Sequence, residues 1–422
     1  MLDMDFIRRN PEIVKEAIRN KGERADVDAL LKLDEERRSL LYESEQLRGR
    51  RNDVSKTIAR MKKSGEDASA LISEMREIGG KVKDYETKLA ELEPQISEII
   101  MSIPNVPAQG VPVGADEEDN EHVGAWGERK EFDFKPKPHW DLAKELGIID
   151  FEAAAKISGA GFALFVGVGA KLERALYTFM LDLHTTKHGY KEVMPPLIVN
   201  RASMTGTGQL PKLEEDMYLC EVDDLFLIPT AEVPVTNIHA GDVLDADRLP
   251  ICYTAYTPCF RREAGSYGKD TRGLMRVHQF DKVEMVKFVR PETSYDELES
   301  LLKNAEEVLR LLGVEYRVLN LCTGDLSFAA AKCYDIEIWA PGIERWLEVS
   351  SCSNFEDFQA RRANIRFKEK GGKPQFVHTL NGSGVALARL VAVLLETYQN
   401  ADGSVSIPEV LHPYMGGMEK IG

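Results

Sequence analysis

The sequence predicts an α+β protein in which an N-terminal antiparallel helical hairpin precedes a larger domain. That domain is expected to hold an antiparallel β-sheet flanked by helices. Three observations predict this fold. A heptad pattern runs through two stretches near the N-terminus, and a Pro/Gly-rich segment follows it. Beyond that segment, β-rich and helical stretches lack the regular alternation of a doubly wound fold.

The hairpin is predicted by apolar residues that recur in steps of three and four, which places them on one seam of a coiled coil. A polar turn at 63–67 separates its limbs, and a short connection between amphipathic helices favours an antiparallel pair. The second limb has an unbroken seam: Leu71, Met75, Ile78, Val82, Tyr85, Leu89, Leu92, Ile96 and Ile99. The seam of the first limb includes three polar residues: Leu33, Arg37, Leu40, Ser44, Leu47, Arg51, Val54, Ile58 and Met61.

The two limbs differ in charge, although the whole chain carries a formal net charge of −16. Residues 32–63 contain ten Lys and Arg against six Asp and Glu, whereas residues 66–98 contain four against nine. The first limb can therefore lie against a phosphate backbone while the second faces away. The alternative is a solvated coiled coil whose charges serve solubility and pairing. The first hypothesis depends on basic residues of the first limb, chiefly Arg48, Arg51, Lys56 and Arg60.

A change in composition marks the predicted boundary between arm and body. Residues 1–103 form the predicted arm domain, 104–135 an irregular Pro/Gly-rich and acidic linker, and 136–422 the body. Within the body, helices are expected at 170–188, 294–312 and 385–398, and strands at 162–168, 225–229, 283–289 and 334–339.

Several functional classes are excluded. The six cysteines form no C-x-x-C pair and no cluster with histidine, which argues against a zinc site or a disulfide framework. The acidic N-terminus is unlike a signal peptide, and no apolar run approaches the ~18 residues of a membrane span. We therefore expect a soluble, cytoplasmic protein with no membrane partner. The sequence GSYGKD at 265–270 falls short of a P-loop.

The densest group of chemically active side chains lies between residues 260 and 284. The sequence FRREAGS at 260–266 is followed by GKDTRGL and RVHQFDKVE, so Arg, Glu and an aromatic residue recur around a Gly-rich loop. Arg261 can donate two hydrogen bonds to a phosphate, and Phe280 offers a ring face to an adenine. A charged surface hairpin is the alternative that composition alone favours.

These residues resemble motif 2 of the class II aminoacyl-tRNA synthetases, in the form typical of the bacterial-type seryl-tRNA synthetase family. The sequence LNGSGVALAR at 380–389 resembles motif 3, and residues 175–196, which end in VMPP, resemble motif 1. The N-terminal hairpin and the stretch that begins with IPEVL at 407 are also similar to that family. The resemblance covers nearly the whole chain. It implies a homodimer, because motif 1 lies in the dimer interface of this class.

The resemblance implies binding sites for L-serine and ATP. Thr230, Ala231 and Glu232 are similar to a T-A-E segment that lies against the amino acid, although alone they would suit a helix cap. Residues implied to bind L-serine are Thr230, Ala231, Glu232, Arg261, Glu284, Asn381 and Ser383. Residues implied to bind ATP are Arg261, Arg262, Glu263, Val277, Phe280, Glu348, Val349, Ser350, Ser351 and Arg389.

The resemblance also implies the catalytic groups and a cofactor. Arg261 and Arg389 would be catalytic, because they would stabilise negative charge on the phosphate oxygens. Glu348 and Ser351 resemble the residues that hold Mg²⁺ in this family, and their oxygen atoms suit that ion. An ordinary strand with a polar edge is the alternative. The loop 265–271 is a candidate to touch the acceptor end of a tRNA.

The resemblance predicts serine tRNA as the second substrate, and selenocysteine tRNA as a further one. In this family the arm recognises the long variable stem of serine tRNA by its shape. Three alternatives stay open: a ligase that loads a carrier protein, an inert relative that binds tRNA as a sensor, and a coiled-coil interaction protein. The long hairpin argues against the first, and intact Arg261, Glu284, Glu348 and Arg389 argue against the other two.

Overall fold

The computed structural model describes residues 1–263 and 272–422, which divide into two compact units. One unit consists of Leu2–Arg19 and Glu23–Pro104. The other consists of Asn105–Gly422 together with Met1 and Asn20–Gly22. Among the described residues, no helix combines the length and the apolar character that crossing a membrane requires.

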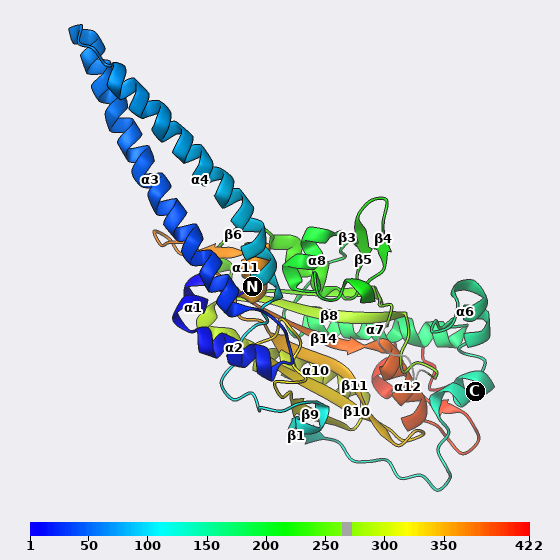
Figure 1. Ribbon diagram of the computed structural model, residues 1–422. Coiled ribbons are helices and arrows are strands. Elements are labelled where there is room, and N and C mark those ends of the chain that lie inside the picture. Colours follow the sequence, from blue (N-terminus) through cyan, green and yellow to red (C-terminus); the bar gives the residue numbers. More distant parts are fainter. Residues whose placement is uncertain (264–271) are drawn as a thin grey trace. The chain divides into compact units, whose positions relative to one another are not determined.

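The first unit contains the predicted antiparallel hairpin, whose two long limbs run side by side (Figure 1). Every predicted seam residue of the second limb is buried or half-buried, and in the first limb only Arg51 is exposed. Gly65 ends the first limb with φ of 78°, a left-handed conformation that glycine adopts without strain. The helices of this unit are α1 (Met4–Arg9), α2 (Pro11–Asn20), α3 (Val27–Ser64) and α4 (Ser69–Ser102).

The second unit is built on an eight-stranded sheet with the order β1-β9-β10-β11-β14-β8-β7-β2. Every pairing in it is antiparallel except that of β2 with β7, which confirms the predicted fold class. β1 lies within the predicted linker, so that segment supplies an edge strand. The strands are β1 (Glu121–Trp126), β2 (Lys191–Glu192), β7 (Ile251–Phe260), β8 (Gln279–Val289), β9 (Tyr316–Asn320), β10 (Lys332–Ala340), β11 (Arg345–Asn354) and β14 (His378–Ala386).

Three smaller sheets and a set of helices complete the second unit. The small sheets contain β3 (Ile198–Asn200), β4 (Leu219–Cys220), β5 (Leu225–Leu227), β6 (Val243–Asp245), β12 (Arg366–Lys368), β13 (Gln375–Phe376), β15 (Val405–Ser406) and β16 (Lys420–Ile421). The α-helices are α5 (His139–Glu145), α6 (Phe151–Ser158), α7 (Val168–Thr186), α8 (Arg201–Thr207), α9 (Glu232–Thr236), α10 (Ser294–Leu312), α11 (Phe358–Ala363) and α12 (Leu387–Thr397). The short 3-10 helices are η1 (Glu117–Asp119), η2 (Glu214–Asp216), η3 (Asn237–His239), η4 (Ala246–Arg248), η5 (Pro291–Thr293) and η6 (Glu409–Leu411).

Most predicted elements of the body are present. The helix predicted at 294–312 has the bounds of α10, and those at 170–188 and 385–398 correspond to α7 and α12. The strands predicted at 225–229, 283–289 and 334–339 correspond to β5, β8 and β10. The strand predicted at 162–168 is wrong, because this stretch makes only an isolated bridge between Phe165 and Ile149. Gly161 and Gly167 adopt positive φ at either end of it and prevent an extended strand.

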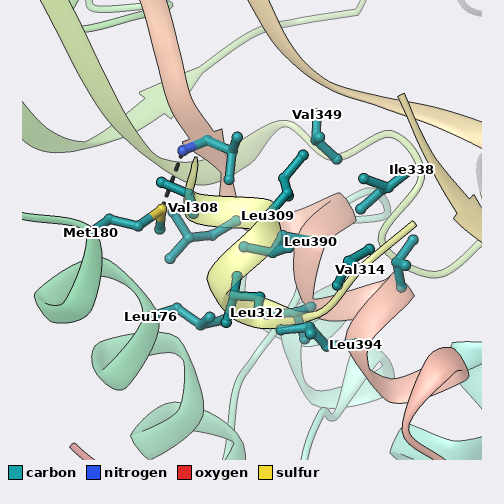
Figure 2. Close-up of a cluster of buried hydrophobic side chains, with 14 of the residues drawn as sticks. Leu176, Met180, Val308, Leu309, Leu312, Val314, Ile338, Val349, Leu390 and Leu394 are labelled. Carbon is teal, nitrogen blue, oxygen red and sulfur yellow. Dashed lines mark hydrogen bonds between the residues drawn. The ribbon is translucent and has the colours of Figure 1, made fainter. Parts of the chain in front are cut away.

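The hydrophobic core fills the space between the large sheet and three helices (Figure 2). The strands that border this core point the side chains of one face into it, and those of the other face are free to line a site. On β8, for example, Val283 and Met285 are fully buried in the core. The core side chains labelled in Figure 2 are Leu176 and Met180 of α7, Val308, Leu309 and Leu312 of α10, Leu390 and Leu394 of α12, and Val314, Ile338 and Val349.

Candidate active site

The opposite face of the sheet borders a cleft of about 430 Å³. Phe280 and Lys282 of β8 line it, and they alternate along the strand with the core residue Val283. The cleft collects most of the predicted site: Thr230, Glu232, Arg261, Glu263, Val277, Phe280, Glu348, Val349, Ser351, Asn381, Ser383 and Arg389.

One end of the cleft is lined by the two predicted catalytic arginines, and the first of them, Arg261, also lines a hollow beside Glu232. Arg261 leaves the end of β7, and its guanidinium carbon lies 5.2 Å from the ring centre of Phe280. Arg389 comes from the first turn of α12 and donates to the backbone oxygen of Glu348 at 2.7 Å. Its guanidinium also lies 3.4 Å from the carboxylate of Glu348. This end therefore offers cationic hydrogen-bond donors and an aromatic face.

A group of oxygen ligands lies beside Arg389. The Ser351 hydroxyl is 3.3 Å from the Glu348 carboxylate and donates to Asp335 at 2.5 Å. Removal from water opposes ionisation of Glu348, but the charges of Arg389 and Arg261 outweigh this effect and lower the pKa of its carboxyl. Loss of hydration, together with the charge of Glu348, raises the pKa of Asp335 well above its usual value.

This donor set fits a magnesium ion that takes most of its ligands from phosphates and water. A carboxylate and a hydroxyl are hard oxygen donors, and Mg²⁺ is rarely enclosed by protein ligands alone. Within residues 1–263 and 272–422, no cluster of three or more His, Cys, Asp or Glu side chains is arranged to bind a metal. Two or three protein oxygens at the cleft suit an ion that arrives with ATP.

The other end of the cleft is built around Glu284, whose side chain is only 1% exposed. Its carboxylate accepts hydrogen bonds from Thr230 at 3.0 Å and Asn381 at 3.2 Å. Lys282 forms an ion pair with it at 2.5 Å and also donates to the Thr230 hydroxyl at 2.9 Å. Thr230, Glu284 and Asn381, three of the predicted serine contacts, thus form one hydrogen-bonded group.

Glu232 is a second buried carboxylate at this end, and it lines the cleft. Burial raises its pKa to about 7, and the nearby charge of Glu284 adds to the shift. Gln359 donates to Glu232 at 2.6 Å and accepts from the Thr379 hydroxyl at 2.8 Å, which fixes the direction of its amide. A substrate ammonium at this position would restore the charged form of Glu232.

Four predicted site residues do not line the cleft. Glu284 lies beneath its surface, in the group described above, and Ala231 is fully buried. Ser350 is buried and donates to the backbone oxygen of Ser383 at 2.6 Å, so it supports a residue that does line the cleft. Arg262 is exposed. The predicted contact loop 265–271 lies outside the described residues.

The structure adds Lys282, Asp335, Arg276 and Gln359 to the site. Lys282 could have been predicted from the sequence. On a strand it lies on the same face as Phe280 and Glu284, which are two residues away on either side. Asp335 could not have been predicted in this way, because it meets Ser351 only through the register of β10 with β11. Gln359 comes from α11, which is distant in the sequence.

The four arm residues predicted to bind tRNA are all exposed. Arg48 pairs with Glu86 of the other limb at 2.7 Å, and Lys56 lies 3.8 Å from Asp53 on its own helix. The predicted charge division therefore produces at least one contact across the hairpin.

The fold and the cleft define a class II aminoacyl-tRNA synthetase core. Residues 218–398 match the model for the tRNA synthetase class II core domain (G, H, P, S and T), and residues 1–107 match the seryl-tRNA synthetase N-terminal domain. The chain belongs to the seryl-tRNA synthetase family. It is 58% identical over the full length of both chains to the serine–tRNA ligase of Geobacter sulfurreducens.

Solved structures agree with this assignment. The chain is similar to the seryl-tRNA synthetase of Pyrococcus horikoshii complexed with ATP, with a TM-score of 0.94 and 41% identity over 100% of this chain and 99% of that one. It is also similar to the cytoplasmic serine–tRNA ligase of Naegleria fowleri in complex with AMP, with a TM-score of 0.89 and 29% identity over 100% and 98% of the two chains.

Proposed function

We propose that the chain is an ATP-dependent serine–tRNA ligase, which activates L-serine to seryl-adenylate and transfers the seryl group to the 3′ end of serine tRNA. Relatives of that name, aligned over the whole chain, support this reaction. The observation that carries the proposal is the chemistry of one cleft. The cleft is lined by two arginines, Arg261 and Arg389, and by the buried carboxylate of Glu232, and a second buried carboxylate, that of Glu284, lies beneath its surface.

In the first step, the serine carboxylate attacks the α-phosphorus of ATP, and the bond to the β-phosphate oxygen breaks to release pyrophosphate. The attacking group is already ionised, so no general base is needed. Arg261 and Arg389 donate to the phosphate oxygens as negative charge builds on them. The face of Phe280 stacks on the adenine. Glu348 and Ser351 would hold Mg²⁺, which would supply positive charge to neutralise the phosphates.

The buried end selects the amino acid. Glu232 and Glu284 accept from the serine ammonium and hydroxyl, and Asn381 and Ser383 complete the polar wall. Lys282, which forms an ion pair with Glu284 at the buried end, suits the serine carboxylate or the α-phosphate. A site that pairs with a hydroxyl discriminates against alanine by roughly 10⁴-fold or more, because its polar groups would be left unpaired.

In the second step, a hydroxyl of the terminal ribose of the tRNA attacks the seryl carbonyl carbon, and AMP leaves. The basic limb of the arm, with Arg48, Arg51, Lys56 and Arg60, contacts the RNA backbone. The exposure of all four side chains supports this role. Selenocysteine tRNA is a second acceptor in this proposal.

We further propose a homodimer that acts in the cytoplasm. Next to the motif 1 helix, Met194 is 89% exposed, and Leu197 and Ile198 are 37% and 47% exposed, an apolar group that a second copy would cover. None of the six cysteines, all of them within the described residues, is paired, as is usual in a reducing compartment. Sedimentation of the purified chain tests the dimer, and an active monomer at assay concentration would contradict it.

Two assays test the function together. The first measures exchange of labelled pyrophosphate into ATP with serine, alanine or threonine, and the second measures transfer of labelled serine to bulk tRNA. We expect exchange with serine alone, followed by transfer. Exchange without transfer would favour a ligase that loads a carrier protein. Binding of tRNA with neither activity would favour an inert relative.

A further inference from the structure

A buried histidine–carboxylate pair lies behind the arginine end of the cleft. His139 of α5 and Glu396 of α12 both have no exposed side-chain surface. The Nδ1 atom of His139 lies 2.7 Å from the Glu396 carboxylate, which also accepts from the backbone N–H of His139 at 2.9 Å. A third donor, the backbone N–H of Gly342, reaches the same carboxylate at 2.8 Å. The carboxylate is therefore fully engaged.

The second ring nitrogen of His139 holds a segment that lines the cleft. Its Nε2 atom accepts a hydrogen bond from the backbone N–H of Leu274 at 3.1 Å. An acceptor nitrogen carries no proton, so the proton of a neutral ring is on Nδ1, where the Glu396 carboxylate accepts it. The carboxylate thus selects the tautomer that can hold Leu274.

The same helix holds the next peptide as well. Arg389 and Glu396 are seven residues apart on α12, which is about two turns, so both project from one side of the helix. Arg389 donates from Nε to the backbone oxygen of Met275 at 3.4 Å. Residues 274 and 275 are consequently attached to α12 at two points, directly through Arg389 and indirectly through His139.

The start of α5 makes further contacts with this segment. The guanidinium carbon of Arg272 lies 4.6 Å from the ring centre of Trp140, and Arg272 is 3.6 Å from the carboxylate of Asp141. Gly273 has φ of 66°, and a Cβ atom there would lie 2.4 Å from Nε2 of His139. The close approach of Leu274 to His139 thus requires a glycine at 273.

The segment that is held in this way contributes directly to the cleft. Leu274, Met275, Arg276 and Val277 all line it. Arg276 pairs with Glu263 at 3.0 Å, so a shift of the backbone at 274 would move a cation of the arginine end. Glu232 and Glu284 of the buried end take hydrogen bonds from residues outside this segment. Arg276 of the segment also lines a hollow next to Glu232.

We propose that His139 and Glu396 are positioning residues for ATP. They fix residues 274–277 against α12 and so set Arg276 and Val277 relative to Arg389. The proposal rests on the function proposed above for the same cleft, but it assigns a role to two residues that touch no substrate. Loss of this attachment weakens ATP binding and leaves serine binding nearly unchanged.

Two substitutions of His139 separate its two hydrogen bonds. His139→Asn keeps a donor near the Nδ1 position but removes the acceptor for Leu274, whereas His139→Gln places an amide oxygen near the Nε2 position. We expect His139→Asn to raise the KM for ATP about tenfold, the effect of one buried N–H left unpaired. The KM for serine should stay within about twofold of the parent value, and His139→Gln should recover most of the ATP affinity.

A matched control is His239, a buried histidine that also faces a carboxylate, at 3.2 Å from Asp242, and does not line the cleft. His239→Asn should lower the melting temperature without changing either KM. If the His139 variants fail to fold, Gly273→Ala keeps both residues of the pair but places a Cβ atom against Nε2 of His139, so that Leu274 must move away from the ring. It should raise the KM for ATP alone.

The proposal would be overturned if His139→Asn had the same KM for ATP as the parent, or if its KM for serine rose as much as its KM for ATP. An unchanged KM for ATP in Gly273→Ala would overturn it as well. Calorimetric titration with ATP alone separates this result from the proposed function. If the parent binds ATP but shows no serine-dependent exchange, the proposed function fails. The ATP affinity of the variants still decides the role of His139.

Discussion

Charged side chains pair differently on the arm and in the cleft. On the arm, Arg48 and Glu86 meet at 2.7 Å while 53% and 51% of their side chains remain exposed. In the cleft, Lys282 and Glu284 meet at 2.5 Å with only 8% and 1% exposed. An exposed pair contributes ~0–1 kcal/mol, whereas breaking a buried pair leaves a charge that costs about 3–5 kcal/mol.

This difference suits the two tasks that we propose. A cation of the arm can leave its carboxylate for a phosphate at little cost. Charges in the cleft are fixed in place before the substrates arrive, as catalysis by preorganised groups requires. Burial in the cleft also raises the pKa of Glu232 to about 7.

The largest effect is expected at the arginine end of the cleft. Arg261→Ala should reduce serine-dependent pyrophosphate exchange by about 10³-fold or more, because a preorganised donor to the α-phosphate is lost. Arg262→Ala should have a much smaller effect, because Arg262, although predicted to bind ATP, is exposed and does not line the cleft. Exchange rates and melting curves of both variants check the prediction. Near-parental exchange in Arg261→Ala would remove that residue from the catalytic site.

The next effect separates the arm from the cleft. Replacing residues 48–86 with a short turn should leave exchange within about twofold of the parent but lower serylation of tRNA by about 100-fold, because phosphate contacts are lost. Arg48 and Glu86 lie opposite each other on the two limbs, so the cut removes both members of their pair. Initial rates of exchange and of tRNA charging are the measurements. Unchanged charging would make the arm dispensable.

The arm and the cleft also differ in how far the sequence predicted them. The seam of the hairpin depends on local periodicity, and all nine of its second-limb residues are buried or half-buried. The cleft depends on which strands are neighbours. Asp335 reaches Ser351 because β10 pairs with β11, and no local pattern contains that register. Family motifs supplied Glu232 and Glu284, but not their partners Gln359 and Lys282.

A smaller effect should appear as a pH dependence of serine affinity. Burial raises the pKa of Glu232 from its ordinary 4.5 to about 7, so below pH 7 the free enzyme holds this carboxyl protonated. Binding of the serine ammonium requires the carboxylate and releases a proton. The KM for serine should therefore fall about tenfold as the pH rises from ~6 to ~8.

Glu232→Gln should raise the KM for serine at pH 8 and flatten its pH profile. A matched variant is Glu348→Gln, because the pKa of Glu348 is lowered by Arg389 and Arg261 and the group stays ionised across this range. In Glu348→Gln, the KM for serine should fall with rising pH as steeply as in the parent. If the KM for serine in Glu232→Gln still depended on pH as it does in the parent, a group other than Glu232 would be responsible for the pH dependence.

The smallest effect tests whether a cation of the arm can exchange its carboxylate partner for an RNA phosphate. Arg48 can bind either Glu86 or an RNA phosphate, and the competing pair is exposed. Glu86→Gln should therefore strengthen tRNA binding a few-fold, since it removes a pair of ~0–1 kcal/mol. Arg48→Gln should weaken binding by a similar factor and make the slope of log Kd against log salt shallower by about one. Arg51→Gln should do the same, because this side chain is exposed as well.

The double variant Arg48→Gln with Glu86→Gln gives the decisive comparison for the arm. If Glu86 acts only by competing for Arg48, its substitution should have no effect once Arg48 is gone. Filter binding of serine tRNA at several salt concentrations measures all four proteins. Strengthening by Glu86→Gln that persists without Arg48 would mean that Glu86 repels the RNA directly, and the pair across the hairpin would then have no part in tRNA binding.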